Sequence, residues 1–437
     1  MKKIFKKIIV VIISWQARLV LRKYRPKVVG ITGSVGKTGT KEAVAQVLSQ
    51  HFTVRKSPKS FNSELGVPLA ILDCDNAWYS LGGWIKNILE GFSLIVFRST
   101  YPEWLVLEVG VDRPGDIRNV VKFVKFDLAI ITRLPEIPVH LEFFKSSEGL
   151  INEKLLLARS VSPLGTVILN HDDPKIMAIA DELKAEVITY GWDEKATIRA
   201  SNERIMYHDE NENLNRLPDG LSLRVDYEGS TIPFRIKGLL AHHQLSGVLA
   251  AIAVGVSQGI NLVEIASALE KLQASPGRFN LLPGIKQTLI IDDSYNSSPA
   301  ALESALKVLD QIEVVEKGRK IAVLGDMMEL GAKTIEAHRV AGVQVAKVCG
   351  NLITVGIRAK FIAESAREKK MSEKKMTHFD TAEEAAVALQ ELIKPHDVIL
   401  IKGSQSTRLE KVVEEIMLHP ENKEKLLVRQ EPQWKNK

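Results

Sequence analysis

The sequence predicts an α/β protein with two domains, each built around a mostly parallel sheet covered by helices. Short apolar runs typical of buried strands alternate with helical patterns along most of the chain. A glycine-rich turn joins the first of these strands to a helix, an arrangement that opens many nucleotide-binding domains. The length of 437 residues also exceeds what one compact core usually holds, which favours two or three domains.

The first 27 residues precede the first domain and are expected to form a short helix that is both basic and apolar. Residues 8–15 form a run of apolar or small side chains flanked by lysines. This run is far shorter than the roughly 20 residues of a membrane-spanning helix, and no small-residue cleavage site of a signal peptide follows it. Two interpretations stay open: a partly buried helix packed on the body of the protein, and a helix lying in a membrane interface.

Residues 28–275 form the first predicted domain. Its first strand begins at Lys27 and ends in glycines, and a small antiparallel insertion is expected at about 196–237. The segment 78–97 is rich in large apolar groups and predicts a core-facing helix pair, with a membrane-facing surface as the alternative. Further strands and helices of this domain are expected at Lys41–Gln50 (helix), Trp104–Val109, Leu128–Thr132 and Thr166–Asn170 (strands), Leu245–Gln258 and Leu262–Leu272 (helices).

Residues 276–425 form the second predicted domain, which repeats the alternation of strands and helices in a Rossmann-like manner. The charged tail, residues 426–437, is expected to be loose. The strands of this domain are expected at Thr288–Asp292, Lys320–Leu324, Asn351–Val355 and Val398–Ile401.

Composition excludes several classes of protein. With 45% hydrophobic residues and 26% charged residues, the chain has enough apolar material for packed cores, which excludes wholesale disorder. The formal net charge of +6 is a mild excess concentrated at the ends, which indicates an anionic surface contact or solubility rather than nucleic-acid binding. Cys74 and Cys349 are far apart, so a reducing cytoplasm fits better than a disulfide framework.

The glycine-rich turn predicts a phosphate-binding loop. It reads Gly33-Ser34-Val35-Gly36-Lys37-Thr38, between a strand and a helix. Backbone N–H groups in such a loop, with a helix N-terminus behind them, suit an anionic phosphate. Lys37 would neutralise the β- and γ-phosphates of ATP, and Thr38 would place its hydroxyl on Mg²⁺. The full Walker pattern needs a glycine where Ile31 stands, so the alternative is a glycine turn beside a solvated lysine.

The loop resembles the ATP-binding loop of the Mur ligases, and seven later segments resemble motifs of that family in the family's order. The likeness runs from about residue 28 to 415. The DDSYN and GDMMELG segments favour the MurF branch, which adds D-alanyl-D-alanine to a UDP-muramoyl tripeptide. The seven segments begin at Asn62 (NSELGVPL), Glu108 (EVGVDRPGDI), His140 (HLExF), Leu169 (LNHDDP), Asp292 (DDSYNSSP), Leu324 (LGDMMELG) and Lys402 (KGS).

The resemblance implies an ADP-forming peptide ligase of peptidoglycan precursor synthesis. Such ligases transfer the γ-phosphoryl group of ATP to a carboxylate, and an amine then attacks the acyl-phosphate. We expect a cytoplasmic monomer that uses a nucleotide-linked muramoyl peptide and D-Ala-D-Ala as substrates. Residues 1–25 of the protein could contact the inner face of the membrane. The alternatives are a Mur-type ligase for another acid and amine, of the folylpolyglutamate or cyanophycin kind, and a non-catalytic nucleotide-binding scaffold of wall synthesis.

The resemblance also implies roles for individual residues. Mg²⁺, as one or two ions, would be held by Thr38, Glu108 and His140. Lys154 matches a position where several Mur ligases carry a carbamylated lysine that bridges the metals, the alternative being an ordinary exposed lysine. The nucleotide is expected to contact the phosphate loop and Asn170, Asp172, Asp173, Arg278 and Asp293. The substrates are expected to contact Tyr295, Asn296, Ser297, Lys402, Ser404 and Arg408, although Arg408 could equally be a solvated surface residue.

Two departures from the family pattern matter for these expectations. Where the family reads H-N-x-x-N after the insertion, this chain has His243-Gln-Leu-Ser-Gly247, so the adenine contact of the second asparagine is absent or supplied elsewhere. MurF enzymes also carry a UDP-binding domain ahead of the loop, where about 27 residues stand here. A segment of that size cannot fold alone, which puts recognition of the UDP-sugar in question.

Overall fold

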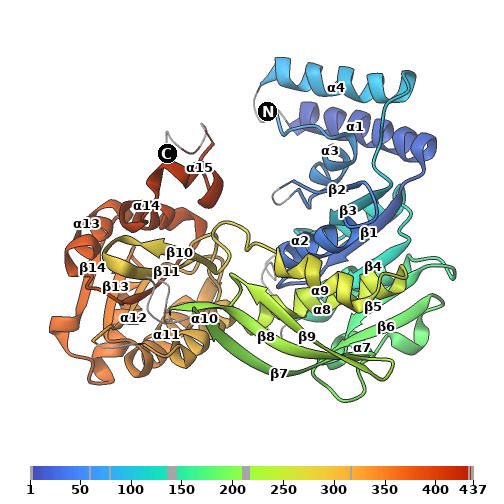
Figure 1. Cartoon of the computed structure of the whole chain (residues 1–437). Coiled ribbons are helices and arrows are strands. Elements are labelled where there is room, and N and C mark those ends of the chain that lie inside the picture. The colour runs from blue at the N-terminus through green and yellow to red at the C-terminus, as the bar shows by residue number, and fades with distance from the viewer. Residues whose placement is uncertain are drawn as a thin grey trace. The chain divides into compact units, whose positions relative to one another are not determined.

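The protein is described by a computed structural model that covers residues 3–58, 61–77, 80–134, 144, 146–208, 217–314, 317–431 and 434, with side chains from residue 8 on except at His243 (Figure 1). Its chain divides into two compact units. The first comprises residues 1–202, 223–234 and 243–272, and the second comprises residues 203–222, 235–242 and 273–437. Each unit combines helices with a sheet, and the predicted α/β class is confirmed.

The first sheet has nine strands in the order β2-β3-β1-β4-β5-β6-β7-β8-β9. The pairs from β2 through β7 are parallel. Strands β8 and β9 are joined by Glu228 and Gly229, both with positive φ, and a two-residue turn of this kind makes an antiparallel hairpin. The strands are β1 (Lys27–Thr32), β2 (Val54–Lys56), β3 (Trp104–Glu108), β4 (Leu128–Ile131), β5 (Thr166–Asn170), β6 (Glu186–Gly191), β7 (Ile198–Tyr207), β8 (Pro218–Tyr227) and β9 (Ser230–Lys237).

Helices cover this sheet on both faces, as expected for parallel strands. On one face, Leu105, Leu107 and Ile131 belong to a core shared with α1, α3, α4, α5 and α6. On the other face lie α2, α8 and α9 (Figure 1), where Gly255 of α8 packs against Ile265 of α9. The helices are α1 (Lys3–Tyr24), α2 (Lys37–Leu48), α3 (Gly66–Leu72), α4 (Leu81–Val96), α5 (Asp116–Val121), α6 (Ser147–Arg159), α7 (Pro174–Met177), α8 (His242–Ser257) and α9 (Leu262–Glu270).

The N-terminal helix is longer than the apolar run that predicted it. Helix α1 spans 22 residues, and its buried stripe of Ile9, Ile13, Ala17 and Val20 belongs to the core of the first unit. The partly buried helix considered from the sequence is therefore present. Among the described residues, no helix combines the length and the apolar character needed to cross a bilayer.

The segment 78–97 forms one helix, α4, instead of the expected pair, and residues 78 and 79 lie outside the described part. Trp84 and Gly91 are buried, and a Cβ at Gly91 would lie 2.5 Å from Gln16 Oε1, so the glycine permits the close approach of α4 to α1. Gln16 Nε2 donates to the Ile88 carbonyl at 2.8 Å. The opposite side of α4 is exposed, so the prediction of a core-facing segment holds for only one face.

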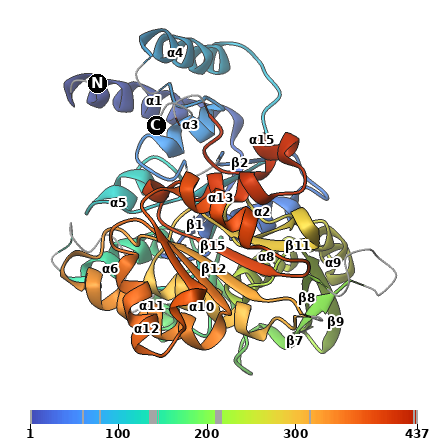
Figure 2. The same ribbon diagram turned by 90° about the vertical axis from the view of Figure 1, so that its left-hand side faces the viewer.

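The second unit contains a six-stranded sheet in the order β10-β11-β15-β12-β13-β14, antiparallel between β10 and β11 and otherwise parallel. Helices α10–α12 lie on one side of β12 and β15 and α13 on the other (Figure 2). The alternation along each strand agrees with this, since Leu400 belongs to the core on the first side and Ile399 and Ile401 to the core on the second. The elements are β10 (Asn280–Gly284), β11 (Thr288–Asp293), α10 (Pro299–Gln311), β12 (Lys320–Gly325), α11 (Thr334–Val348), β13 (Asn351–Val355), α12 (Lys360–Glu368), β14 (Met376–Phe379), α13 (Ala382–Leu392), β15 (Val398–Lys402), α14 (Glu410–Ile416) and α15 (Lys423–Leu426).

The C-terminal tail differs from the loose segment expected from its charge. Leu427 and Arg429 are buried, and the Arg429 guanidinium donates to Glu410 Oε2 at 2.7 Å and to the Tyr295 carbonyl at 2.5 Å. The prediction does not hold for these two residues, because Leu427 packs in a core of the second unit, and a buried ion pair and backbone acceptors fix Arg429.

Candidate active site

The phosphate loop lies between β1 and α2, and its backbone depends on two glycines. Gly33 has a φ of 143° and Gly36 has a φ of 87°. Residues that carry a side chain rarely adopt such positive φ values. A Cβ at Gly33 would also lie 2.0 Å from Thr132 Oγ1. Gly36 is the N-cap of α2, and no side chain of the described residues caps this helix, so the first N–H groups of α2 are available to an anion.

Thr38 and Glu108, both expected to hold a metal, lie in contact. Thr38 Oγ1 donates to Glu108 Oε2 at 3.1 Å, because β1 and β3 pair in parallel with Ile31 opposite Glu108. Glu108 is only 2% exposed, and Asn62 Nδ2 donates to its Oε1 at 3.0 Å. Both of these side-chain donors are neutral, and they hold the two carboxylate oxygens in place at the strand end. Oxygen ligands of this type suit Mg²⁺.

Asn62 is a site residue that sequence reasoning did not assign. Besides bonding Glu108, it packs so closely on Gly110 that a Cβ there would lie 2.9 Å from Asn62 Cγ. The signal was available, since Asn62 opens one of the family-like motifs. Its contact with a strand end 46 residues away could not be read from that motif.

Lys154 reaches the phosphate loop from α6. It is buried, and its Nζ donates to Ser34 Oγ at 2.7 Å. Burial, with a smaller contribution from the nearby Lys37 ammonium, lowers the pKa of Lys154 to about 7. The alternative of an ordinary exposed lysine is wrong, because the side chain is directed into the protein towards the loop.

The remaining residue expected to hold the metal, His140, lies outside the described residues. Within the described part of the chain, no group of three or more His, Cys, Asp or Glu side chains is arranged to hold a metal ion. The oxygen donors of Thr38 and Glu108 are thus the portion of the expected metal site that the structure brings together.

The strand-end residues Asn170, Asp172 and Asp173 have local roles in the first unit. Asn170 Oδ1 accepts from the Asp172 N–H at 3.0 Å, and the Asp172 carboxylate accepts from Trp192 and Asp193 N–H groups. Asp173 caps α7 through the Lys175 N–H. These bonds, all within the chain, shape the carboxyl end of β5. Contact of Asn170 and Asp173 with a nucleotide stays a prediction.

Asp173 also accepts from the Leu134 N–H at 2.8 Å. This bond fixes the chain just beyond β4, where the backbone of Arg133 faces the phosphate loop. There the Ser34 N–H donates to the Arg133 carbonyl at 2.8 Å. Asp173 therefore supports the loop from behind.

Gly247, which stands where the family pattern has asparagine, packs on the first turn of α2. A Cβ at Gly247 would lie 2.9 Å from Thr40 Oγ1 and 3.0 Å from the Thr40 backbone nitrogen. The close approach of α8 to α2 leaves no room for a larger side chain at this position. The departure from the family pattern therefore has a packing cause within the first unit.

In the second unit, Asp293 and Lys402 form an ion pair at the carboxyl ends of β11 and β15, which place them opposite each other. Lys402 Nζ donates to Asp293 Oδ2 at 2.6 Å and to the Asn296 carbonyl at 3.0 Å. Burial raises the pKa of Asp293, while the Lys402 ammonium opposes that rise. Both residues were expected to contact ligands, and the structure joins them to each other.

The 292–297 segment begins with the last two residues of β11 and is fixed by bonds to backbone groups. Asp292 is fully buried and accepts from the Gly277 N–H at 3.1 Å, and burial raises its pKa to about 6. The Arg278 guanidinium lies 3.9 Å from the centre of the Tyr295 ring. The Ser297 N–H donates to Asn296 Oδ1. Arg278, Tyr295, Asn296 and Ser297 therefore belong to one local cluster.

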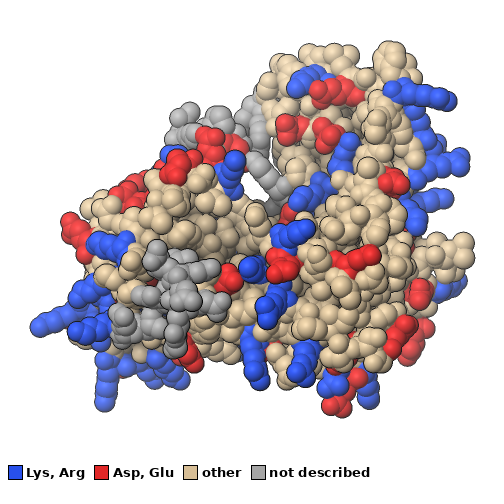
Figure 3. Space-filling model, in the orientation of Figure 1, with Lys and Arg blue, Asp and Glu red and all other residues tan. Residues whose placement is uncertain are grey.

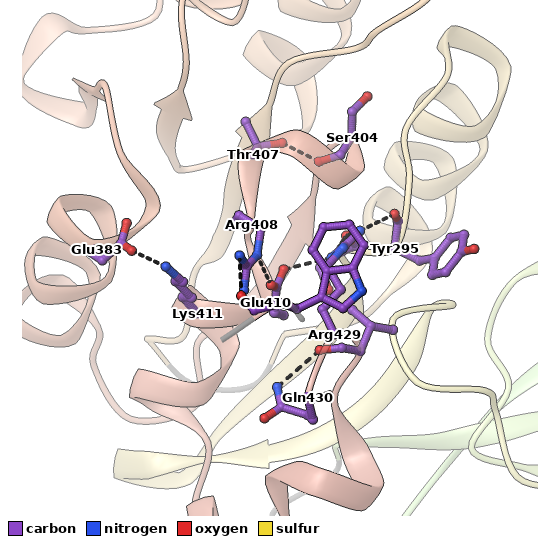
Figure 4. Close-up of polar contacts among 12 residues, drawn as sticks. Tyr295, Glu383, Ser404, Thr407, Arg408, Glu410, Lys411, Arg429 and Gln430 are labelled. Carbon is purple, nitrogen blue, oxygen red and sulfur yellow. Dashed lines mark hydrogen bonds and ion pairs between the residues drawn. The ribbon is translucent and has the colours of Figure 1, made fainter. Parts of the chain in front are cut away.

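Ser404 and Arg408, both expected to bind the dipeptide, have partners within the second unit (Figure 4). Ser404 Oγ accepts from the Met328 N–H at 3.0 Å. Arg408 Nε donates to Glu410 Oε1 at 2.5 Å and Nη1 donates to the Trp434 carbonyl at 3.0 Å. The Arg408 side chain is only 14% exposed, so the alternative of a solvated surface residue is wrong.

Figure 4 also shows that Glu410 lies between Arg408 and Arg429, and that Arg429 extends to the Tyr295 carbonyl. Burial lowers the pKa of Arg429, and the Glu410 carboxylate opposes that change. This Arg408–Glu410–Arg429 chain was not predicted, because Arg429 stands in the tail that looked loose. It links two segments expected to face substrate.

The arrangement of the loop agrees with the likeness of this chain to known proteins. Residues 89–255 match the Mur ligase middle domain, and residues 277–405 match the Mur ligase, glutamate ligase domain. The UDP-N-acetylmuramoyl-tripeptide–D-alanyl-D-alanine ligase of Mycobacterium leprae is 30% identical over 399 residues, which span 87% of this chain and 72% of the relative. The chain belongs to the Mur ligase family.

Two further proteins show the same relation. The ligase of the same name from Bacillus subtilis is 27% identical to this Mur ligase over 405 residues, 92% of this chain and 79% of the relative. The crystal structure of MurF ligase from Thermotoga maritima in complex with ADP matches with a TM-score of 0.74 and 26% identity, covering 93% of this chain and 83% of that chain. The family and the class of enzyme predicted from the motifs, a ligase closest to MurF, are confirmed.

Proposed function

We propose that this Mur ligase adds D-alanyl-D-alanine to a UDP-N-acetylmuramoyl tripeptide, with conversion of ATP to ADP and phosphate. The observation that carries the proposal is the Thr38–Glu108 contact beside an uncapped helix N-terminus. It gives one edge of a parallel sheet both anion-binding N–H groups and oxygen ligands for a cation. The relatives named for this reaction match the chain over most of its length.

The chemistry of the loop residues suits the first half of this reaction. The N–H groups of the loop and the start of α2 bind phosphate oxygens, and the Lys37 ammonium neutralises charge on the transferred group. In the structure, Lys37 Nζ donates to the Gly33 carbonyl at 2.9 Å, so it lies within the loop. Thr38 and Glu108, together with His140, would hold Mg²⁺, which would polarise the phosphoryl group. The muramoyl tripeptide carboxylate then receives the γ-phosphoryl group, and the dipeptide amine displaces phosphate.

Lys154 is proposed to carry a carbamate. A lysine amine must be unprotonated to attack CO₂, and a pKa of about 7 leaves much of Lys154 unprotonated near neutral pH. The new C–N bond forms as a proton leaves the nitrogen, and the product is an anion suited to a second Mg²⁺. A carbamate signal in ¹³C NMR after equilibration with ¹³C-bicarbonate, absent from a Lys154→Met variant, would support this modification.

Contacts of the second unit with ligands are likewise proposed. The paired charges of Asp293 and Lys402 stand at strand ends, the usual place for ligand-binding groups in such sheets. We assign Asp293, Arg278, Asn170 and Asp173 to the nucleotide. Lys402, Ser404, Arg408, Tyr295, Asn296 and Ser297 are assigned to the substrates. We further propose that the enzyme acts as a cytoplasmic monomer that contacts a membrane surface.

The test is a phosphate-release assay with MgATP, the UDP-muramoyl tripeptide and D-Ala-D-Ala, with each substrate omitted in turn. We expect release to require both substrates, and the Lys37→Ala variant to lose at least about 100-fold in rate. The exposed Lys56 provides the control substitution to alanine. Release with glutamate in place of D-Ala-D-Ala would favour a ligase for another acid and amine. Full complementation of a ligase-deficient strain by Lys37→Ala would favour a scaffold.

A further inference from the structure

Helices α1 and α4 together expose an apolar surface that the proposed reaction does not use. Along α4 every third or fourth residue of one face is a large exposed apolar side chain, and Leu89 and Val96 are 63% and 68% exposed. Along α1 the corresponding exposed residues are Ile8, Val11 and Trp15. The full α4 stripe consists of Leu81, Ile85, Leu89, Phe92 and Val96.

The two stripes form one surface. Trp15 of α1 and Phe92 of α4 meet edge to face, with ring centroids 6.0 Å apart. In Figures 1 and 2 the two helices run side by side. Beyond the ring contact, Lys23 Nζ donates to the Leu94 carbonyl at 2.8 Å and Tyr24 Oη donates to the same carbonyl at 3.0 Å. Monomeric soluble proteins rarely expose contiguous apolar surface of this kind without an interaction to serve.

The charges around this surface are mostly positive. The α1 stripe continues from Trp15 at the same spacing into Arg18 and Arg22, both exposed. The first 41 residues contain no Asp or Glu, and residues 2, 3, 6 and 7 are lysines. On α4, Glu90 lies 3.6 Å from Lys86. Figure 3 shows this region at the upper right as a mostly tan surface, with blue side chains along its outer edge and a few red side chains among the tan ones.

We infer that the α1–α4 surface docks the protein onto an anionic lipid membrane, with both helices lying in the plane of the interface. Apolar stripes carrying Trp and Phe and flanked by basic residues suit the boundary between headgroups and acyl chains. Docking in the plane also agrees with the absence, among the described helices, of one that could cross a bilayer. A second copy of the chain fits less well, because its α1 would bring arginines to Arg18 and Arg22 rather than acidic groups.

The membrane contact expected from residues 1–25 is thereby extended to a helix about 70 residues further along the chain. The surface is built by packing, since Gly91 and Gln16 set the distance between the two helices. It is part of the folded first unit and needs no ordering on binding. The inference stands independently of which acid and amine the ligase joins.

The experiment is vesicle flotation with the full chain. Vesicles contain either phosphatidylcholine alone or phosphatidylcholine with about one third phosphatidylglycerol. The test variant is Leu89→Ser with Val96→Ser, which preserves net charge and changes only exposed side chains. The matched control is Val263→Ser with Val387→Ser, two apolar residues on other helices that are also more than half exposed. Circular dichroism and nucleotide binding verify that each variant is folded.

We expect the wild type and the control to float with the anionic vesicles and the test variant to bind at least about tenfold more weakly. Arg18→Gln should weaken binding about fivefold, and added salt should weaken it further. Equal binding of the wild type and the test variant would overturn the inference, as would failure of the wild type to bind either vesicle. A concentration-dependent dimer in sedimentation equilibrium that the test variant abolishes, without vesicle binding, would instead assign the surface to a second copy.

Discussion

Replacing Lys154 with methionine should stabilise this protein, whereas most substitutions of buried residues destabilise. The reason is electrostatic, because the Lys154 ammonium is buried beside the like charge of Lys37, and the partner described for it is the neutral Ser34 hydroxyl. The pKa of Lys154 in the folded state, about 7, lies well below the ordinary lysine value of 10.5. A lysine whose pKa falls on folding binds its proton less tightly in the folded state, and this difference opposes folding.

The structure sets the size and the pH range of the effect. A pKa that falls from 10.5 to about 7 corresponds to an upper limit of roughly 5 kcal/mol. Relaxation and water penetration reduce such penalties, and the variant loses one hydrogen bond, so we expect a net gain of about 2 kcal/mol. The penalty is complete below about pH 7, where Lys154 is protonated in both states. It diminishes as the pH rises towards 10.5, because the folded protein then releases the buried proton at a falling cost while the unfolded chain still keeps its own.

Thermal unfolding checks this expectation with the wild type and Lys154→Met in CO₂-free buffer containing EDTA, at about pH 7 and about pH 9. The difference in Tm should favour the variant at the lower pH and shrink at the higher pH. Lys41→Met is the matched control: Lys41 is equally buried, but it donates to the Ser57 carbonyl at 2.8 Å and lies 3.3 Å from Glu42. Its replacement should destabilise at both pH values. If Lys154→Met instead lowers Tm as Lys41→Met does, the electrostatic reasoning is refuted.

Three further predictions follow from the geometry. Glu108→Gln should retain the fold but raise at least about tenfold the Mg²⁺ concentration needed for half-maximal phosphate release, as measured by magnesium titration. An unchanged Mg²⁺ concentration would exclude Glu108 as a ligand. Gly33→Ala should lower the free energy of unfolding by about 2 kcal/mol and weaken nucleotide binding in calorimetry, because its Cβ would overlap Thr132. Gly39→Ala is the control, since its Cβ meets open space and should leave both quantities unchanged. Equal effects of the two substitutions would contradict the clash. Arg429→Gln should destabilise the second unit by about 3 kcal/mol in urea unfolding, since it leaves buried Glu410 with one fewer cation; a change within about 0.5 kcal/mol would show that the ion pair contributes little.

Strands with apolar runs and clear boundaries could be predicted from the sequence. Thr166–Asn170 and Asn351–Val355 have the expected bounds because both strands are fully buried and the centre of each is apolar. Strands Val54–Lys56 and Met376–Phe379 were not anticipated, since they are short and only partly buried. Helix α1 extends beyond the apolar run of residues 8–15, because its second half alternates buried apolar and exposed basic residues instead of forming an apolar run.

In the candidate site too, some contacts could be predicted from the sequence and others could not. The contact of Thr38 with Glu108 follows from local motifs that end neighbouring parallel strands, so sequence reasoning could place both at one edge of the sheet. The burial of Lys154 against Ser34 depends on where α6 packs, 120 residues along the chain from the loop. Similarly, the pairing of Asp293 with Lys402 depends on the strand order of the second sheet. Such contacts require the tertiary fold, which no local pattern specifies.

The buried stripe of α1 has a practical consequence for anyone who prepares this protein. Ile9, Ile13, Ala17 and Val20 contribute to the same core as the strands that carry the phosphate loop. Truncating the chain ahead of Lys27 to improve its behaviour in solution would uncover that core, and the shortened protein would be expected to aggregate. Solubility is better sought by polar substitutions on the outward side of the helix, which leave its inward side intact.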